Sequence, residues 1–513
     1  MTRALRWRDS KWAIAGLLSA LLPCLFMWGF TVDDALISVR YARHLAAGLG
    51  YRFNDGGAVT DGVTPLPWAF VLAPLAGAPA SALDVLMRAK CMGLVAWSAV
   101  AVAFGVAVGR APGMGASGMG APGMGAPGVG LAHEPGVGSR WARPAKWAKV
   151  AALVTNAVSL PVAAHAVSGM ETGLAMALAA GGALAVGARS YTCAVLAGCA
   201  AALRPEMAPW AAVLAFGAGW GSMARRRSMG RAVLHAAIAL VPFASCAAVR
   251  VAVFGRPAPL AVLAKPSDVT YGALYAAVAL MVAASPVLVL SPRALARAPR
   301  AARVVVAAAM VHVVAIVAVG GDWMPYARLF APVAPSLAWA YVLALPHAHR
   351  IATALRAGVA IAAGAVNFVH AAPLGRAVMD DRRALVERAR PYLDGVGSVA
   401  AVDIGWISAA TEGRIVDLAG VTDPDIAVLP GGHTSKRVDP ALLLSKNPDA
   451  LLFYIRGAAP DLSAWPNAPY GYLVEARLAH AELLGAHFAP RAFLPLGHRG
   501  AGYFLLTRRR KNE

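Results

Sequence analysis

Two adjacent acids follow the first long apolar segment and begin a run rich in groups able to do chemistry. We expect a helix that Asp33, or the preceding Thr31, caps, with Asp34, Arg40 and Arg43 on it. Asp33 and Arg40 share one face of such a helix, and Asp34 and Arg43 lie near it. A carboxylate at a helix N-terminus is favoured in its ionised form, so the pair holds the best general-base candidates. The residues alone leave open a capped interfacial helix without a catalytic role.

Four further polar clusters lie at the ends of apolar stretches. In chain order they are SGMET at 168–172 with Glu171, LRPE at 203–206 with Arg204 and Glu206, Lys265 after a Pro-rich turn, and GGDWMPYAR at 320–328 with Asp322 and Arg328. Any one of them could be a turn with a satisfied ion pair. Several on one side of a membrane favour a site, because ionisable groups are costly at membrane depth. Acids mixed with Arg and Lys would suit an anionic, lipid-linked substrate whose phosphate needs positive partners.

The composition decides what kind of element can position these clusters. The chain has 513 residues, of which 59% are hydrophobic and 14% charged, with a mean hydropathy of +0.59. Soluble proteins average about 45–50% apolar and about 25% charged residues, so disorder, a nucleic-acid module and an ordinary cytosolic enzyme are excluded. The net charge of +21 is expected in cytoplasmic loops and indicates no nucleic-acid partner. The five cysteines lie in apolar stretches without metal spacing, which predicts neither a disulfide framework nor a zinc site.

Apolar segments predict a polytopic α-helical membrane protein with about eleven transmembrane helices. The predicted spans are residues 12–30, 85–109, 148–164, 172–188, 191–203, 208–223, 232–252, 270–290, 303–319, 327–345 and 351–368. The first follows basic residues as a signal peptide would, but it lacks a clean cleavage site, so we expect an uncleaved helix. The shorter, Pro-rich stretch 65–78 predicts an interfacial or re-entrant helix.

Charge then orients the chain and divides it. The basic residues of the short loops all fall on one side of the predicted map, which places the N-terminus in the cytoplasm of a cell with the protein in its inner (plasma) membrane. Residues 1–370 form the transmembrane module, and 110–147, with a Gly/Pro/Met repeat, is predicted to be a flexible cytoplasmic loop. Residues 371–513 are predicted to form an extracytoplasmic α/β domain. Its expected strands are 398–404, 415–418, 450–454 and 502–506, and its expected helices are 384–393 and 473–484.

The order of these motifs carries a resemblance. The run DDALISVRYARHLAAGLGYRFNDGGAVTDGVTPLPW resembles the first outer loop of GT-C membrane glycosyltransferases, and more narrowly of the terminal β-(1→2)-arabinofuranosyltransferase family and its uncharacterised bacterial relatives. SGMET, LRPE, the stretch ending at Lys265, GGDWMPYARLFAP and the tail segment 403–424 have counterparts in the same order. Together they cover most of the chain, although none is specific alone.

The resemblance implies a catalytic module that takes a sugar from a polyprenyl-phosphate donor on the outer face. By this resemblance one acid of the pair is the base on the acceptor hydroxyl, and we favour Asp33 over Asp34. Arg204, Lys265 and Arg328 would hold the donor phosphate. Glu171, Glu206 and Asp322 would orient sugar hydroxyls or hold those cations, with Arg40 and Arg43 as further substrate-binding residues. The reaction would be an inverting displacement at the anomeric carbon with the lipid phosphate leaving.

Several alternatives stay open. Arabinofuranose is the sugar of the nearest characterised relatives, while a hexose, and a glycan, lipid or protein acceptor, are also compatible with the sequence. No cofactor is implied, and a divalent cation requirement is left open. A transporter or flippase of lipid-linked saccharides is the second reading, but we find no paired repeats of the kind transporters show. A structural membrane protein with an exported domain is the third, and it would leave the acids without a function.

Overall fold

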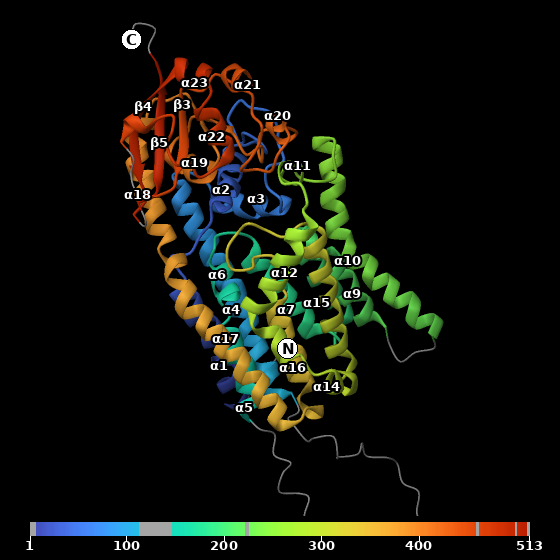
Figure 1. Cartoon of the computed structure of the whole chain (residues 1–513). Coiled ribbons are helices and arrows are strands. Elements are labelled where there is room, and N and C mark those ends of the chain that lie inside the picture. Colours follow the sequence, from blue (N-terminus) through green and yellow to red (C-terminus); the bar gives the residue numbers. More distant parts are fainter. Residues whose placement is uncertain (1–6, 112–145, 221–224, 458–460, 498–499, 510–513) are drawn as a thin grey trace, which may run out of the picture.

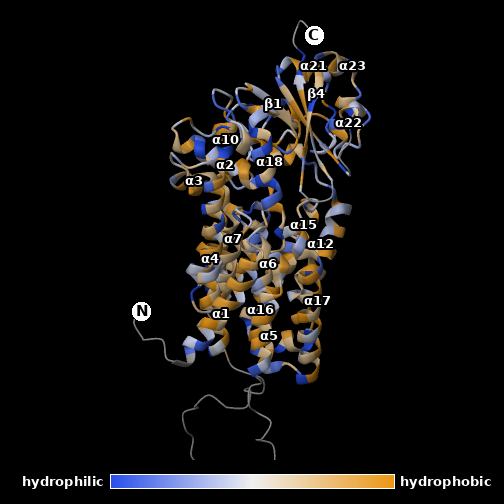
Figure 2. Ribbon diagram, turned by 90° about the vertical axis from the view of Figure 1, so that its left-hand side faces the viewer, coloured by the Kyte–Doolittle hydropathy of each residue, from blue (hydrophilic) through white to orange (hydrophobic). Residues whose placement is uncertain are grey.

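A computed structural model describes residues 7–111, 146–220, 225–457, 461–497 and 500–509. A bundle of helices forms one end of the molecule, and a smaller domain with a β-sheet covers the opposite end (Figure 1). Most of the predicted loop 110–147 lies outside the described residues. Coloured by hydropathy, the bundle is dominated by hydrophobic residues, whereas hydrophilic segments concentrate around the domain and at the bundle's far tip (Figure 2).

The bundle consists of helices that run from the N-terminus to residue 376. They are α1 (Trp7–Phe26), α2 (Asp33–Ala46), α3 (Leu66–Leu72), η1 (Ala73–Leu75), α4 (Ala82–Arg110), α5 (Lys146–Ala157), α6 (Leu160–Ala166), α7 (Thr172–Ala185), α8 (Ser190–Leu203), η4 (Pro205–Met207), α9 (Ala208–Gly219), α10 (Arg225–Phe254), α11 (Leu260–Ala264), α12 (Val269–Ala283), α13 (Ser285–Leu288), α14 (Pro292–Arg297), α15 (Arg300–Ala318), α16 (Ala334–Ala344), η5 (Leu345–His347) and α17 (Arg350–Arg376).

Several of these helices are long and apolar enough to cross a membrane. Within the described residues five qualify, namely the segments 9–26, 82–110, 227–254, 300–318 and 350–393, and a sixth arises if α5 and α6, bent by 53°, count as one span. α7, α8 and α12 are apolar but shorter. Each of the eleven predicted segments contains a helix, and the Pro-rich stretch 65–78 contains α3 and η1.

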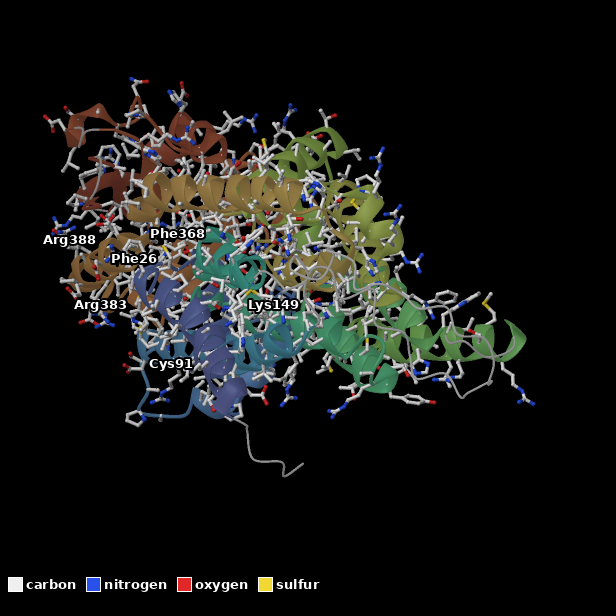
Figure 3. The ribbon with its side chains drawn as sticks, turned by 90° about the horizontal axis from the view of Figure 1, so that it is seen from below. Phe26, Cys91, Lys149, Phe368, Arg383 and Arg388 are labelled. Atoms are coloured by element: carbon white, nitrogen blue, oxygen red, sulfur yellow. The ribbon has the colours of Figure 1, made fainter. Side chains whose placement is uncertain are left out.

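Small residues let the bundle helices approach closely. A Cβ atom on Gly16 of α1 would lie 2.2 Å from the carbonyl oxygen of Ala101 in α4, and one on Gly105 would lie 2.1 Å from that of Trp12. Such contacts replace the missing hydrophobic driving force between helices in lipid. The view along the bundle shows Phe26 of α1 beside Phe368 of α17 (Figure 3), with ring centroids 5.6 Å apart.

The C-terminal domain is built around a five-stranded mixed sheet. Its elements are α18 (Val378–Leu393), β1 (Ser398–Ala401), α19 (Ile404–Ala410), β2 (Arg414–Asp417), α20 (Pro424–Ala427), α21 (Pro440–Ser445), β3 (Ala450–Ile455), η6 (Leu462–Ala464), α22 (Leu473–Ala479), α23 (Glu482–His487), β4 (Phe488–Pro495) and β5 (Gly502–Arg508).

The strand order is β2-β1-β3-β5-β4, with β1 parallel to β2 and β3, and β5 antiparallel to β3 and β4. The four predicted strands and two predicted helical regions are present, which confirms a small α/β domain. β4 was not predicted; its sequence carries Pro490 and Pro495, and Pro is confined to sheet edges. β4 is indeed an edge strand.

Candidate functional site

A cavity of about 420 Å³, the main cavity, is lined in part by residues of α2 and α11. Both helices lie at the end of the bundle nearest the C-terminal domain (Figure 1). Its walls come from α2, the loop 62–65, the starts of α7 and η4, α11, and the segment after α15. Seven of the ten predicted site residues line it: Asp34, Glu171, Arg204, Glu206, Lys265, Asp322 and Arg328. Asp33, Arg40 and Arg43 do not. Five segments far apart in sequence thus bring acids and cations to one hollow.

Arg204 is the deepest cation of the main cavity. Its Nη1 lies 2.7 Å from Glu171 Oε1 and its Nη2 2.7 Å from Glu206 Oε1, and the side chains of Arg204 and Glu171 are almost fully buried. The second oxygen of Glu171, Oε2, is buried with no hydrogen-bond partner among the described residues. A buried carboxylate oxygen without a hydrogen-bond partner is costly, and a ligand hydroxyl could reach this one only after its neighbours move, because the atom has almost no accessible surface.

The loop between α15 and α16 contributes a second ion pair. Arg328 Nε donates to Asp322 Oδ2 at 2.6 Å, and Arg328 Nη1 contacts the sulfur of Met170 at 3.4 Å. Burial alone would raise the pKa of Asp322, but Arg328, Lys265 and Arg204 together lower it below its ordinary value. Asp322 is therefore an ionised acceptor that holds Arg328 in place.

Lys265 and Asp34 are the accessible pair of the main cavity. Their Nζ and Oδ2 atoms are 3.9 Å apart, and their side chains are 25% and 23% exposed, in contrast to the buried Arg204 and Arg328 pairs. The Lys265 ammonium also lies 5.4 Å from the ring centroid of Trp323. A loose pair on a flexible stem can change partner when an anion arrives.

A smaller cavity of about 40 Å³, the interdomain cavity, adjoins the main cavity. Both are lined by Asp34, Ile37 and Lys265, and the C-terminal domain adds Asp403, His433 and Tyr472, among others, to the smaller one. His433 is packed against Trp323 with ring centroids 5.6 Å apart. Burial and the nearby Lys265 lower the pKa of His433 to about 4, so this ring is neutral near pH 7. Asp34 thus lies where the two cavities meet.

Asp33 has a different neighbourhood from Asp34. Its Oδ2 accepts the backbone N–H of Gly405 at 2.9 Å and its Oδ1 that of Trp406 at 2.8 Å, so both oxygens are used at the first turn of α19. A Cβ atom on Gly405 would lie 2.1 Å from the Asp33 carbonyl oxygen, and only glycine permits this approach. Burial and the nearby Asp403 raise the pKa of Asp33 to about 8, although the two N–H groups lower it.

The predicted N-cap of α2 was wrong. The N-cap residue is Val32, without a side-chain hydrogen bond. Thr31 instead donates to the Ser168 carbonyl oxygen at 3.0 Å, and Asp33 serves a helix of the other domain. Long-range partners outcompeted the local cap that the spacing favours.

Arg40 and Arg43 also face the C-terminal domain. Arg40 donates to the carbonyl oxygens of Phe53 at 2.7 Å, Thr411 at 3.2 Å and Gly413 at 2.8 Å. Arg43 pairs with Glu412 at 3.0 Å on the surface. Asp33 and Arg40 lie seven residues apart on α2. Asp33 accepts hydrogen bonds from the start of α19, and Arg40 donates hydrogen bonds to the chain that follows the end of α19. The role of Arg40 and Arg43 in substrate binding stays a prediction, and the structure places their polar atoms on backbone groups and Glu412 outside the main cavity.

A buried ion pair that we did not predict braces the cavity wall. Arg250 Nε lies 2.7 Å from Asp61 Oδ2, with side chains 3% and 1% exposed, and Arg250 Nη2 donates to the Thr64 carbonyl oxygen at 2.6 Å. Gly62 N–H donates to the hydroxyl of Tyr41 at 3.1 Å. A lone arginine within a predicted span was the available signal, because such residues normally have a partner.

The described residues contain no group of three or more His, Cys, Asp or Glu side chains arranged to hold a metal ion. A family model described as Domain of unknown function (DUF8728) matches residues 378–502, from α18 to the start of β5. No curated protein and no solved structure matches the chain significantly. The family match lies within the C-terminal domain, and its description names no activity.

Proposed function

We propose that the protein is a membrane glycosyltransferase that moves a sugar from a polyprenyl-phosphate donor to a hydroxyl acceptor. One observation carries the proposal: seven polar residues from five distant segments line one cavity at the end of an apolar bundle. Ionisable groups are costly near a membrane, so their convergence favours a functional site over a set of unrelated turns with satisfied ion pairs. The resemblance of their motifs to GT-C glycosyltransferases supplies the reaction class, with arabinofuranose as the first sugar to test.

The main cavity fits a phosphate-linked headgroup. Lys265, the accessible cation, is the group that can turn toward a phosphate without breaking a buried pair. Val262 and Val319 line the same cavity and are 55% and 46% exposed, so we infer that a prenyl chain leaves the cavity past them into the hydrocarbon.

Asp34 is the general base in this proposal, in place of Asp33. Its carboxylate is partly exposed at the junction of the two cavities, whereas both oxygens of Asp33 are occupied by backbone N–H groups. The acceptor oxygen bonds to the anomeric carbon as its proton passes to Asp34. The bond from that carbon to the phosphate oxygen breaks, its electron pair stays on the phosphate, and Lys265 offsets the growing charge.

We further propose that the chain crosses the inner membrane about eleven times, with the N-terminus cytoplasmic and the C-terminal domain extracytoplasmic. The ends of α5, α14 and α17 that carry basic residues lie far from the C-terminal domain (Figure 1), as expected if they face the cytoplasm. The short apolar helices α7, α8, α9 and α16 would then cross as part of the packed bundle.

A transporter of lipid-linked saccharides is a weaker proposal. Transporter sites usually lie near the bilayer midplane, between discontinuous helices of paired repeats. The main cavity is instead lined in part by α2 and α11, which lie at the end of the bundle next to the C-terminal domain.

Turnover by the purified full chain tests the proposal. We would incubate the protein in nanodiscs with synthetic polyprenyl-phosphate sugars, arabinofuranose first, and measure release of polyprenyl phosphate. We expect turnover by the wild type, unchanged donor binding without turnover by Asp34→Asn, and weaker donor binding by Lys265→Met. Lys446→Met is the matched control, because Lys446 pairs with Asp423 and Asp425 outside the main cavity. Absence of turnover by the wild type with every donor, or movement of intact saccharide across vesicles, would overturn the proposal.

A further inference from the structure

A third hollow of about 260 Å³, the tyrosine groove, lies on the other side of the loop that bears Asp322. Its walls come from α6, α12, the loop 322–327 and α17. The lining is mainly aromatic and aliphatic, with Tyr271, Tyr275, Trp323 and Tyr326 as its aromatic side chains and Asp322 and Asn367 as its carboxylate and amide side chains.

The groove faces the surface that a bilayer would cover. Leu274 and Met281 of α12 are 62% and 65% exposed, and Val366 and Val369 of α17 are 56% and 68% exposed. α17 belongs to a candidate membrane span. Exposed aliphatic side chains on both flanking helices imply that hydrocarbon surrounds the mouth of the groove, so a hydrocarbon chain is the occupant that its lining and location fit.

The wall between the groove and the main cavity is a strained loop. Tyr326 and Ala327 have φ angles of +60° and +50°, a region that is unfavourable for a residue with a side chain. Tyr326 donates to the Ala371 carbonyl oxygen at 2.8 Å, and Tyr275 of α12 accepts the N–H of Leu329 at 3.1 Å. The groove's own tyrosines hold this conformation, and such strain is concentrated at functional sites.

The polar end of the groove leads to Asp34. Asp322 lines both the groove and the main cavity, and Trp323 lines both the groove and the interdomain cavity. Lys265 Nζ lies 5.4 Å from the Trp323 ring centroid and 3.9 Å from Asp34 Oδ2. Trp323 therefore separates the groove from the interdomain cavity that Asp34 lines.

We propose that the tyrosine groove binds the hydrocarbon chain of the acceptor, so that the acceptor is itself a membrane-anchored saccharide. This inference rests on the proposed function. Donor and acceptor would approach from opposite sides of the loop 320–328, the donor through the main cavity and the acceptor through the groove. The acceptor hydroxyl would give its proton to Asp34 as its oxygen bonds to the anomeric carbon, and polyprenyl phosphate would leave toward the donor side.

The test compares acceptors that differ only in their chain. A methyl glycoside and a dodecyl glycoside of the same sugar would be offered to the full chain in nanodiscs with a fixed donor, and KM and kcat measured for each. The dodecyl compound gains apparent affinity from partitioning into the bilayer in every variant. If the groove binds the chain, a substitution in the groove should remove part of this gain in apparent affinity.

Val278→Trp is the groove variant, because Val278 lines the groove yet is 43% exposed, which lets a larger side chain enter without repacking a core. Met281→Trp is the matched control, on the same helix and 65% exposed but outside the groove lining. We expect Val278→Trp to raise KM for the dodecyl glycoside at least tenfold and to leave kcat and the methyl glycoside unchanged. Met281→Trp should behave as the wild type.

A binding measurement keeps this inference separate from the proposed function. A dodecyl glycoside with a photoreactive chain should label α12 and α17 in the wild type and in Met281→Trp, and label them several-fold less in Val278→Trp. If no donor supports turnover but this labelling pattern is found, the proposed reaction is wrong, whereas the binding of a hydrocarbon chain in the tyrosine groove is supported. Equal labelling in all three proteins, or equal KM values for the dodecyl glycoside in both tryptophan variants, would overturn the inference.

Discussion

The two faces of α2 show how one short helix serves two parts of the molecule. The face with Asp33 and Arg40 bonds to backbone groups of the C-terminal domain, and its polar atoms are occupied. The face with Asp34, Ile37 and Ser38 lines the main cavity, and the Asp34 carboxylate keeps access to it. Side chains of consecutive residues in a helix point about 100° apart, so the two adjacent aspartates have different surroundings. We call these the docking face and the cavity face.

The largest expected effect belongs to the cavity face. Asp34→Asn keeps the shape of the side chain but cannot take a proton, so kcat for sugar transfer should fall by about 10²–10⁴-fold. Its melting temperature should match the wild type, because the Lys265 contact it loses is long and partly exposed. Steady-state assays and thermal unfolding check both expectations. Wild-type turnover by Asp34→Asn would return the base role to Asp33.

Substitutions on the docking face should lower the stability of the protein more than they change the rate of sugar transfer. Asp33→Ala leaves the N–H groups of Gly405 and Trp406 without acceptors, at a cost of about 2–4 kcal/mol. We expect faster proteolytic release of the C-terminal domain and a lower melting temperature. Gly405→Ala, which would force α19 away from α2, should reproduce the phenotype with Asp33 intact. An Asp33→Ala protein that is fully stable yet inactive would break the distinction between the faces.

The docking face should also respond to pH. Burial, with the nearby Asp403, raises the pKa of Asp33 from 3.8 to about 8. Between these values the folded state binds a proton more tightly than the unfolded chain, so the stability that this group contributes falls as pH rises from about 4 to about 8. Melting temperatures across this range should show a decline in the wild type that is smaller in Asp33→Asn. Parallel pH profiles for the two proteins would contradict the assignment.

The smallest effect is expected at Arg43. Its pair with Glu412 is on the surface, where Glu412 is 73% exposed, and such pairs contribute about 0–1 kcal/mol. Arg43→Ala should change unfolding free energy by less than about 1 kcal/mol and leave transfer unchanged, as measured by denaturation and turnover. A loss as large as that of Asp33→Ala would mean that the docking face depends on charge rather than on backbone hydrogen bonds.

Much of the fold could be predicted from the sequence because its signals are local. Apolar length predicted the helical segments, and β-branched runs between turns predicted four strands of the C-terminal sheet. The polar clusters were recognisable because ionised side chains stand out against an apolar chain. Whether eleven helices cross a membrane stays a prediction, since α7, α8 and α9 are too short to qualify alone.

The roles within the site were harder to predict because they depend on partners hundreds of residues away. Nothing near Asp33 indicates that its oxygens bond to Gly405 and Trp406 rather than to its own helix. The pairing of Asp61 with Arg250 likewise joins residues 189 positions apart. Local spacing placed the two acids side by side but could not decide that Asp34 alone of the pair lines the main cavity, while both line the interdomain cavity.

The contact between α2 and α19 has a consequence for biosynthesis. The hydrogen bonds of Asp33 join it to residues 372 and 373 positions later, and at about 5–20 residues per second the ribosome needs about 20–75 s to make that interval. Through that time α2 lacks its contacts with α19. A late part of the nascent chain then packs against one of its earliest parts, so the interdomain cavity can form only after the C-terminal domain has been made, and a product truncated before Gly405 would lack its wall from that domain.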